Sequence, residues 1–272
     1  MTSGRRSTLI ALASTLVFAA VIVLVVSNAP GWPAVKQAFF NGAVFRESLG
    51  VIPEAFLVNV KIFLVAELLI LPFALLIAVL RTLPGPVFFP LRAIAVVYTD
   101  LFRGIPTILV IYMLGFGIPA LQLGWLPVET EFWGIPYWGV LALVLVYSAY
   151  VSEVYRAGID SVHPSQAAAA RSLGLSHGRA LRFVVLPQAV RRVIPPLLND
   201  FIGLQKDTAL VGLLGVVEAF RQAQIEAAEN FNFTPYVVAA LLFILLTIPL
   251  ARLTDWLVAR DRRRQLATGG AP

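Results

Sequence analysis

The chain has 272 residues, of which 59% are hydrophobic and only 13% are charged, and its formal net charge is +6. Soluble domains carry about 25% charged residues, so this composition excludes a soluble globular protein and predicts an integral membrane protein. Because the chain has no cysteine and only two histidines, it can form no disulfide or thiolate metal site, and no metal or other cofactor is expected.

Six apolar segments are long enough to cross a bilayer core of about 30 Å as helices. They lie at residues 9–27, 54–80, 92–118, 137–155, 190–217 and 235–258. Lys and Arg gather before the first segment, in the turn after the second, in the long loop after the fourth and at the C-terminus. Since positive charge marks the cytoplasmic side, we expect a multi-pass protein with both termini in the cytoplasm. A cleaved signal peptide is the competing interpretation of the first segment, but that apolar run is longer than a usual signal core.

Charged and polar side chains within the predicted spans are candidates for function, because a charge at membrane depth is costly. Arg103 lies near the middle of the third span and Glu67 near the middle of the second. A planar guanidinium suits a carboxylate, so Arg103 is expected to take a substrate carboxylate and Glu67 an ammonium group. Lys206, Asp207 and Thr208 form a second polar cluster in the fifth span. These five residues are predicted to bind substrate or to form a gate.

The alternative role for these groups is structural, as ion pairs that only fix the register of one span against another. Two further acidic residues are interpreted in this way. Glu153 lies three residues before Arg156 near the end of the fourth span, and we expect it to hold the following loop. Asp200 is expected to have a structural or gating role.

The loop from residue 161 to 196 is a basic, Ala-rich island that holds five arginines and no acidic residue. Pro164 suits the first position of a helix, and Gly174 stands where a left-handed cap would end it. Ser176 is expected to cap a second short helix that Pro187 closes. On composition alone, this hairpin could rest its arginines on anionic lipid headgroups.

The residue spacing in this loop resembles the EAA loop of ABC-transporter permeases, the membrane subunits of binding-protein-dependent importers. The family pattern is Glu-Ala-Ala, three residues, Gly, nine residues, then Ile-x-Leu-Pro. Five residues fall at matching positions: Ala169, Ala170, Gly174, Leu186 and Pro187. Val184 stands where Ile is usual, and Ala168 holds the place of the Glu. Any docking must therefore depend on shape, the glycine bend and the arginines.

The resemblance extends to YTDLFRGIPTILV, to SEVYRAGIDSV and to the segment after the loop, which look like the polar amino acid branch of the family. It implies an all-α type I importer fold with six transmembrane helices, namely a five-helix permease core at residues 53–259 and one additional N-terminal helix. Residues 1–52 then form that helix with an external segment, and residues 260–272 a basic cytoplasmic tail.

The resemblance also implies a function and partners. The chain would be a non-catalytic permease subunit that moves a polar amino acid across the bacterial inner membrane, with ATP hydrolysed by a cytoplasmic ABC ATPase dimer. A second permease subunit, identical or related to this chain, an extracytoplasmic amino-acid-binding protein and membrane lipid complete the expected partners, and no nucleic acid is expected. The residues expected to contact the ATPase are Gln166, Ala169, Ala170, Arg171, Leu173, Gly174, Leu175, Leu186 and Pro187.

The sequence also bears on the charge of the substrate and on an alternative function. Arg103 with Lys206 makes a net positive pair, which favours an acidic amino acid such as glutamate, and a glutamate-like or glutamine-like substrate is expected. The alternative function is a self-sufficient carrier or channel that uses Glu67 and Asp207 as ion sites. The sequence has no Gly-rich loop ending in Lys-Ser or Lys-Thr, so ATP hydrolysis by this chain itself is not expected.

Overall fold

The computed structural model describes residues 2–123, 131–132 and 135–267, and nearly all of them are helical. In chain order the elements are α1 (Thr2–Ser27), α2 (Trp32–Phe39), α3 (Gly42–Thr82), α4 (Phe89–Gly104), α5 (Thr107–Tyr112), the π-helix η1 (Met113–Gly117), α6 (Ile118–Ala120), β1 (Glu131–Phe132), β2 (Ile135–Pro136), α7 (Tyr137–Asp160), α8 (Pro164–Ser172), α9 (His177–Ala180), the π-helix η2 (Leu181–Val185), α10 (Leu186–Asp207), the 3₁₀-helix η3 (Thr208–Leu214), α11 (Ala219–Asn230) and α12 (Thr234–Ala267). The strands β1 and β2 form one short antiparallel pair. The prediction of an all-α membrane protein is confirmed.

Four helical segments of the described chain are long and apolar enough to cross a membrane: α1, α3 together with α2, α7 and α12. A fifth is the pair formed by α4 and the α5–α6 segment, which is bent by 107°. Ile105 is extended at this bend, because Pro106 disfavours helical backbone in the residue before it and has no N–H to continue the helix. The predicted fifth span, α10, is less apolar than these segments, so six spans remain a prediction.

The second span begins earlier than the sequence indicates. The stretch expected to be an external segment at residues 28–53 forms α2 and the first part of α3. The Asn41 side chain caps α3 by accepting hydrogen bonds from the backbone N–H groups of Ala43 and Val44. Pro53 lies inside the helix without ending it.

The main core forms where α3, α7 and α10 pack together. Ile62 and Ile70 of α3 and Leu143 of α7 are fully buried there. Phe63 of α3 meets Phe201 of α10 edge to face, with ring centroids 4.3 Å apart. These contacts fix α7 between α3 and α10.

A second core joins α3 to α11 and α12, and α3 also carries a separate buried polar cluster. Asn59 of α3 donates to Thr208 at 3.1 Å and to Glu218 at 2.9 Å, and it accepts a hydrogen bond from the backbone N–H of Ala219 at 3.0 Å. Burial raises the pKa of the Glu218 carboxyl above its usual range, and the hydrogen bonds that it accepts oppose this effect. The cluster fastens the turn between η3 and α11 to α3.

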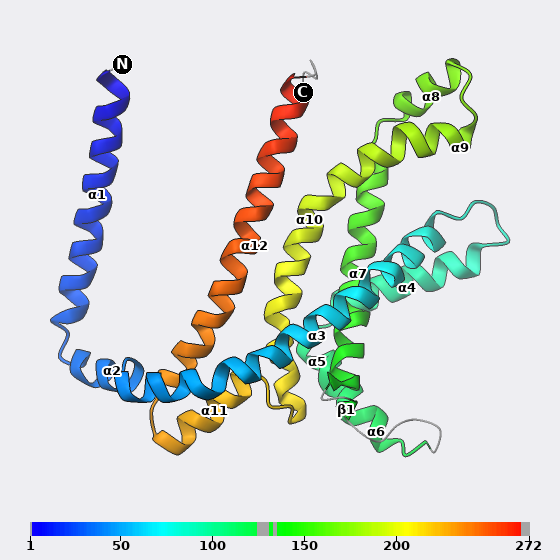
Figure 1. Ribbon diagram of the computed structural model, residues 1–272. Helices are drawn as coiled ribbons and strands as arrows, with labels where there is room; N and C mark the ends of the chain where they lie inside the picture. Colours follow the sequence, from blue (N-terminus) through cyan, green and yellow to red (C-terminus); the bar gives the residue numbers. More distant parts are fainter. Residues whose placement is uncertain (1, 124–130, 133–134, 268–272) are drawn as a thin grey trace.

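The N-terminal helix α1 stands apart from the other helices in Figure 1, and its apolar span is not buried by the rest of the chain. The following helix α2 is fastened to the corner between α11 and α12. There the backbone N–H of Phe233 donates to the carbonyl of Ala38 at 2.7 Å, and the Asn232 amide donates to that of Gln37 at 2.9 Å. The chain that follows α1 is thus fastened to the bundle through α2.

The basic loop forms the two helices that the sequence predicts, with one correction. Pro164 is the first residue of α8, and Gly174 has φ +86°, the left-handed conformation expected of a C-terminal cap. Pro187 does not close the second helix, because the chain continues from α9 through the π-helix η2 into α10. The wider π turn accommodates a proline that has no N–H to offer.

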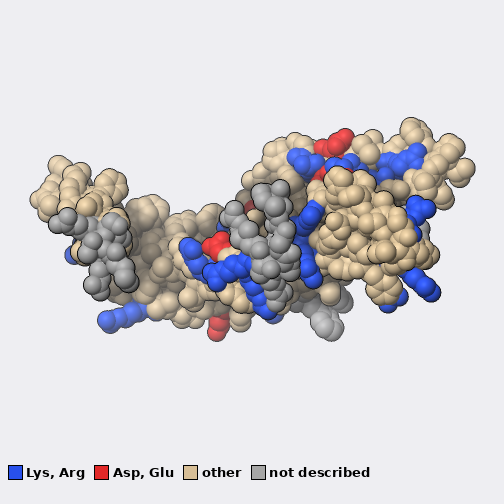
Figure 2. Space-filling view, turned by 90° about the horizontal axis from the view of Figure 1, so that it is seen from above, with Lys and Arg blue, Asp and Glu red and all other residues tan. Residues whose placement is uncertain are grey.

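The loop lies at the same end of the molecule as both termini, whereas α2, α6 and α11 lie at the opposite end (Figure 1). Figure 2 views the molecule from the end that carries the termini and the loop, and Lys and Arg outnumber Asp and Glu on that face.

Candidate functional site

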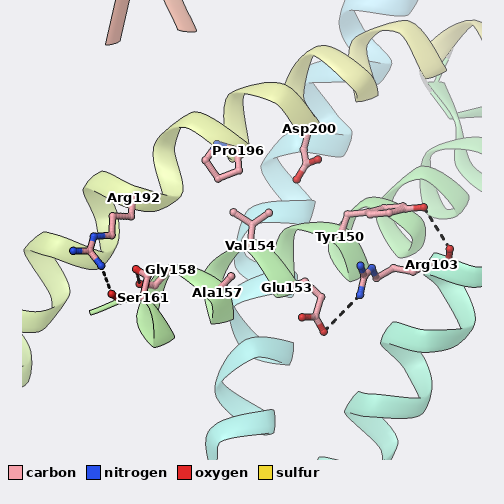
Figure 3. Close-up of a pocket in the computed structure, with 10 residues that line it drawn as sticks. All are labelled: Arg103, Tyr150, Glu153, Val154, Ala157, Gly158, Ser161, Arg192, Pro196 and Asp200. Atoms are coloured by element: carbon pink, nitrogen blue, oxygen red, sulfur yellow. Dashed lines mark hydrogen bonds and ion pairs between the residues drawn. The ribbon is translucent and has the colours of Figure 1, made fainter. Parts of the chain in front are cut away.

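A cavity of about 390 Å³ opens between α4, α7 and α10 (Figure 3). Its lining is formed by Arg103, Tyr150, Glu153, Val154, Ala157, Gly158, Ser161, Arg192, Pro196 and Asp200. The residues from α7 recur every three or four positions, as do those from α10, so each helix presents one face to the cavity. Gly158 allows the two helices to approach, because a Cβ atom at this position would lie 2.9 Å from the Val193 side chain.

Arg103 ends α4 just before the bend at Pro106, which places its side chain in the cavity. Its guanidinium lies 5.8 Å from the centre of the Tyr150 ring, and the Tyr150 hydroxyl is 3.5 Å from the Arg103 carbonyl. The nearest carboxylate oxygen, Oε1 of Glu153, is 3.9 Å away, which is too far for a hydrogen bond. The side chain is 44% exposed. Within the described chain, the guanidinium therefore keeps its donors free for a ligand.

Glu153 is surrounded by three arginines. Its Oε2 accepts hydrogen bonds from Arg156 at 2.7 and 3.1 Å, and its Oε1 forms an ion pair with Arg81 from the end of α3. Arg103 approaches Oε1 from the cavity side. The expected role in holding the loop fits the contact with Arg156, but the structure also puts Glu153 in the cavity wall. Both of its oxygens are engaged, so it is not available to bind a substrate cation.

Asp200 contributes the other acidic group of the lining, from α10 (Figure 3). Its Oδ2 atom is buried and accepts no hydrogen bond from any described residue. A buried carboxylate oxygen without a partner is costly, so such an atom is a good candidate for ligand binding. The cavity therefore combines a cation with free donors and an anion with a free acceptor.

The other predicted substrate residues lie away from this cavity. Glu67 is half-buried on α3 and is not part of the lining. Lys206 is exposed near the end of α10, and Asp207 accepts a hydrogen bond from Tyr147 at 3.0 Å. Thr208 belongs to the buried cluster around Asn59. Of the five residues, the structure brings only Arg103 to the cavity.

Most of the predicted coupling residues lie on the exposed surface of the loop: Gln166, Ala169, Arg171, Leu173, Gly174, Leu186 and Pro187. Leu173 is 83% exposed, and Leu175 is half-buried. Ala170 differs from them, because it is buried against the protein and its carbonyl accepts a hydrogen bond from the N–H of Leu175 at 3.2 Å. This residue supports the bend from inside.

The loop and the cavity share three residues, Ser161, Arg192 and Pro196. Arg192 of α10 donates a hydrogen bond to the carbonyl of Ser161, the first residue after α7, and both residues line the cavity. This hydrogen bond joins the start of the loop after α7 to α10 within the cavity wall, so a movement of one against the other would act on the wall.

Sequence reasoning did not assign Tyr150 or Arg81 and gave Glu153 and Asp200 other roles. A signal was present, because residues 150, 154, 157 and 161 share one face of a helix, as do residues 192, 196 and 200. No cluster of three or more metal-ligating side chains occurs among the described residues.

The fold and the site define a class: a helical membrane protein that carries a polar cavity and a helical loop at one end. The model of the family "Binding-protein-dependent transport system inner membrane component" matches residues 70–263, and the chain belongs to that family. The resemblance drawn from the loop is confirmed. The chain is an inner membrane permease component, and hydrolysis of ATP is not its own activity.

Three relatives illustrate the similarity. The probable glutamine ABC transporter permease protein GlnP of Bacillus subtilis is 34% identical over 208 residues, which cover 75% of this chain and 90% of the relative. The arginine transport system permease protein ArtQ of Bacillus subtilis is 36% identical over 162 residues, covering 59% and 71%. The glutamate transport system permease protein GluC of Corynebacterium glutamicum is 34% identical over 206 residues, covering 72% and 87%.

Two solved structures share the fold. The crystal structure of an amino acid ABC transporter with histidines superposes with a TM-score of 0.70 at 28% identity, covering 79% of this chain and 95% of the other. The MetNI methionine ABC transporter in an inward-facing conformation gives a TM-score of 0.55 at 17% identity, covering 78% and 94%. The second similarity concerns the fold alone.

Proposed function

We propose that this chain is the permease subunit of an ABC importer for a polar amino acid, and that the cavity between α4, α7 and α10 binds the substrate. The observation that carries this is the presence of Arg103 and Asp200 in one cavity, each with free hydrogen-bonding capacity. The carboxylate of an amino acid needs a cationic partner and its ammonium group an anionic one. Relatives named for glutamine, arginine and glutamate transport support this substrate class.

A neutral polar amino acid such as glutamine fits the cavity better than glutamate. The preference for an acidic substrate depended on Lys206, which does not line the cavity. The lining holds Arg103 and Arg192 together with Glu153 and Asp200, so its formal charges balance. The side-chain amide of glutamine adds hydrogen bonds without adding a charge.

The loop is proposed to dock onto a cytoplasmic ABC ATPase dimer through the exposed surface of α8, with Leu173 projecting beside the bend at Gly174. Closure of the ATPase would pull the loop, and the hydrogen bond from Arg192 to Ser161 would carry that movement to the cavity. This orientation puts both termini in the cytoplasm. A second permease subunit and an external binding protein complete the proposed importer, and the exposed helix α1 contacts lipid.

The domain boundaries proposed for this importer follow the sequence. The permease core occupies residues 53–259, preceded by the additional span in residues 1–52 and followed by a basic cytoplasmic tail. The family match begins at residue 70 and so leaves α1 outside it, which supports this division. The helix α12 continues to Ala267, so the first part of the tail is helical.

Reconstitution tests the proposed function. The permease, purified with its ATPase and supplied with the binding protein, is expected to accumulate labelled L-glutamine in liposomes only when ATP is enclosed with the ATPase. Uptake by the chain alone, driven by a proton or sodium gradient, would establish the secondary carrier instead. L-glutamate and L-arginine in the same assay rank the substrates.

A substitution at the bend tests the docking role of the loop. Gly174→Trp puts a large residue at φ +86° beside the proposed contact surface, and we expect it to abolish co-purification of the ATPase while the permease remains inserted in the membrane. Gly85→Trp is the matched control, because Gly85 has φ +85° and equally open surroundings in the turn between α3 and α4. Equal retention of the ATPase by both variants would contradict docking at α8.

A further inference from the structure

We propose that Arg81 is a positioning residue that sets the affinity of the importer for its substrate, by holding Glu153 away from Arg103. This inference rests on the proposed function, in which Arg103 binds the substrate carboxylate. Arg81 lies outside the cavity lining, so it would act through Glu153 and not by touching the substrate.

The first supporting observation is that Arg81 is held firmly. It lies in the last turn of α3, and its side chain is only 15% exposed. Its Nη1 atom donates to Oε1 of Glu153 on α7 and, at 3.3 Å, to the hydroxyl of Thr99 on α4. Thr99 is itself fully buried and donates to the carbonyl of Ala95. One guanidinium thus joins three helices at the edge of the cavity.

The second observation concerns which oxygen each arginine uses. Arg156 occupies Oε2 of Glu153, whereas Arg81 and Arg103 both approach Oε1. Arg81 is in direct contact with Oε1, and Arg103 remains 3.9 Å from it. The two arginines therefore compete for one oxygen, and Arg81 holds it.

Loss of Arg81 would reverse this competition. The Glu153 side chain is only 17% exposed, so Oε1 could not replace its partner fully with water. Arg156 is already engaged with Oε2, whereas Arg103 lies 3.9 Å from Oε1 and its partly exposed side chain is free to move toward it. Once it paired with Glu153, Arg103 would have to break a charge-assisted hydrogen bond before it could bind a substrate carboxylate.

The effect is expected in KM and not in the maximal rate, because the lost interaction concerns binding of the substrate. In the reconstituted importer, Arg81→Gln should raise the KM for L-glutamine on the order of tenfold, with a maximal rate within about twofold of the unaltered protein. Arg81→Lys keeps a cation beside Oε1 and should restore most of the affinity.

The double variant Arg81→Gln/Glu153→Gln separates positioning from a structural role. It removes both the holding cation and the competing carboxylate, so Arg103 stays free and the KM should return to within about threefold of the unaltered value. Arg252→Gln is the matched control, because it removes an exposed arginine from an ion pair with Asp255 on α12, outside the cavity lining.

The KM values of these variants decide whether Arg81 positions Glu153. An unchanged KM in Arg81→Gln, or a KM in the double variant as high as in the single one, overturns the positioning role. If Arg81→Gln does not assemble, the double variant decides, and a tenfold higher KM in it counts against the proposal. Failure of the unaltered importer to transport L-glutamine, L-glutamate or L-arginine would instead reject the proposed function on which the inference rests.

Discussion

Two polar clusters lie within the same helical bundle, and they differ in whether their groups are satisfied. In the cluster around Asn59, the amide makes three hydrogen bonds, and Glu218 also accepts bonds from the backbone N–H groups of Phe220 and Arg221. In the cavity, the Arg103 guanidinium makes no hydrogen bond to a described residue, and Asp200 has an oxygen without a partner in the described chain.

The difference indicates what each cluster does. A buried polar network whose members are all satisfied fixes one arrangement of helices, because any other arrangement would leave some members unpaired. Groups that keep free donors and acceptors in an open cavity leave that capacity to a ligand. By this criterion we assign the predicted gate residue Thr208 to the scaffold, and Asp200, expected to have a structural or gating role, to the proposed site.

The largest effect is expected from breaking the satisfied cluster. Asn59→Leu removes three hydrogen bonds and leaves groups of Glu218 and Thr208 with fewer partners in a fully enclosed position. We expect the free energy of unfolding to fall by about 3 kcal/mol. Thermal unfolding of the detergent-purified protein measures this, and the protein that remains folded should keep the unaltered KM.

Asn28→Leu is the matched control for this prediction. The Asn28 amide donates only to the carbonyl of Leu24 at the exposed end of α1, so the same substitution should change stability by less than about 1 kcal/mol. If Asn59→Leu left stability unchanged but raised the KM strongly, the cluster would be part of the transport site and the contrast between the two clusters would fail.

The short helices of the loop could be predicted because single residues near their ends specify where they begin and end. Pro164 begins α8 and Gly174 ends it as their conformational preferences require. The start of α3 had a signal too, since Asn41 is a good helix cap, but the mixed composition that follows it resembled an external loop. The continuation of the helix through Pro187 could not be predicted, because it depends on a π-helix that no single residue specifies.

The site was predictable only in part. The cost of a charge at membrane depth selected Arg103, which lines the cavity, but the same reasoning applied equally to Glu67 and Lys206, which lie outside it. Helical spacing could have grouped the residues of α7 and those of α10 separately. Which faces of these helices meet is decided by packing between distant segments, such as the close approach of Gly158 to Val193.

A substitution in the cavity is expected to have a smaller effect, and to change substrate affinity instead of stability. Asp200→Asn keeps the shape of the side chain and removes its charge, so the substrate ammonium group would lose its anionic partner. We expect the KM for L-glutamine to rise about thirtyfold, which corresponds to about 2 kcal/mol. Stability should hardly change, because no described residue donates a hydrogen bond to the buried Oδ2 atom.

The matched control is Asp255→Asn, which makes the same chemical change at an exposed ion pair on α12 and should alter neither quantity. The two clusters should then respond in opposite ways. Asn59→Leu lowers stability at constant KM, whereas Asp200→Asn raises KM at constant stability. An Asp200→Asn protein that is clearly less stable but transports with the unaltered KM would move Asp200 into the scaffold. Arg103 would then need another acidic residue to complete a site for an amino acid, and Glu67 on α3 would be the next residue to substitute.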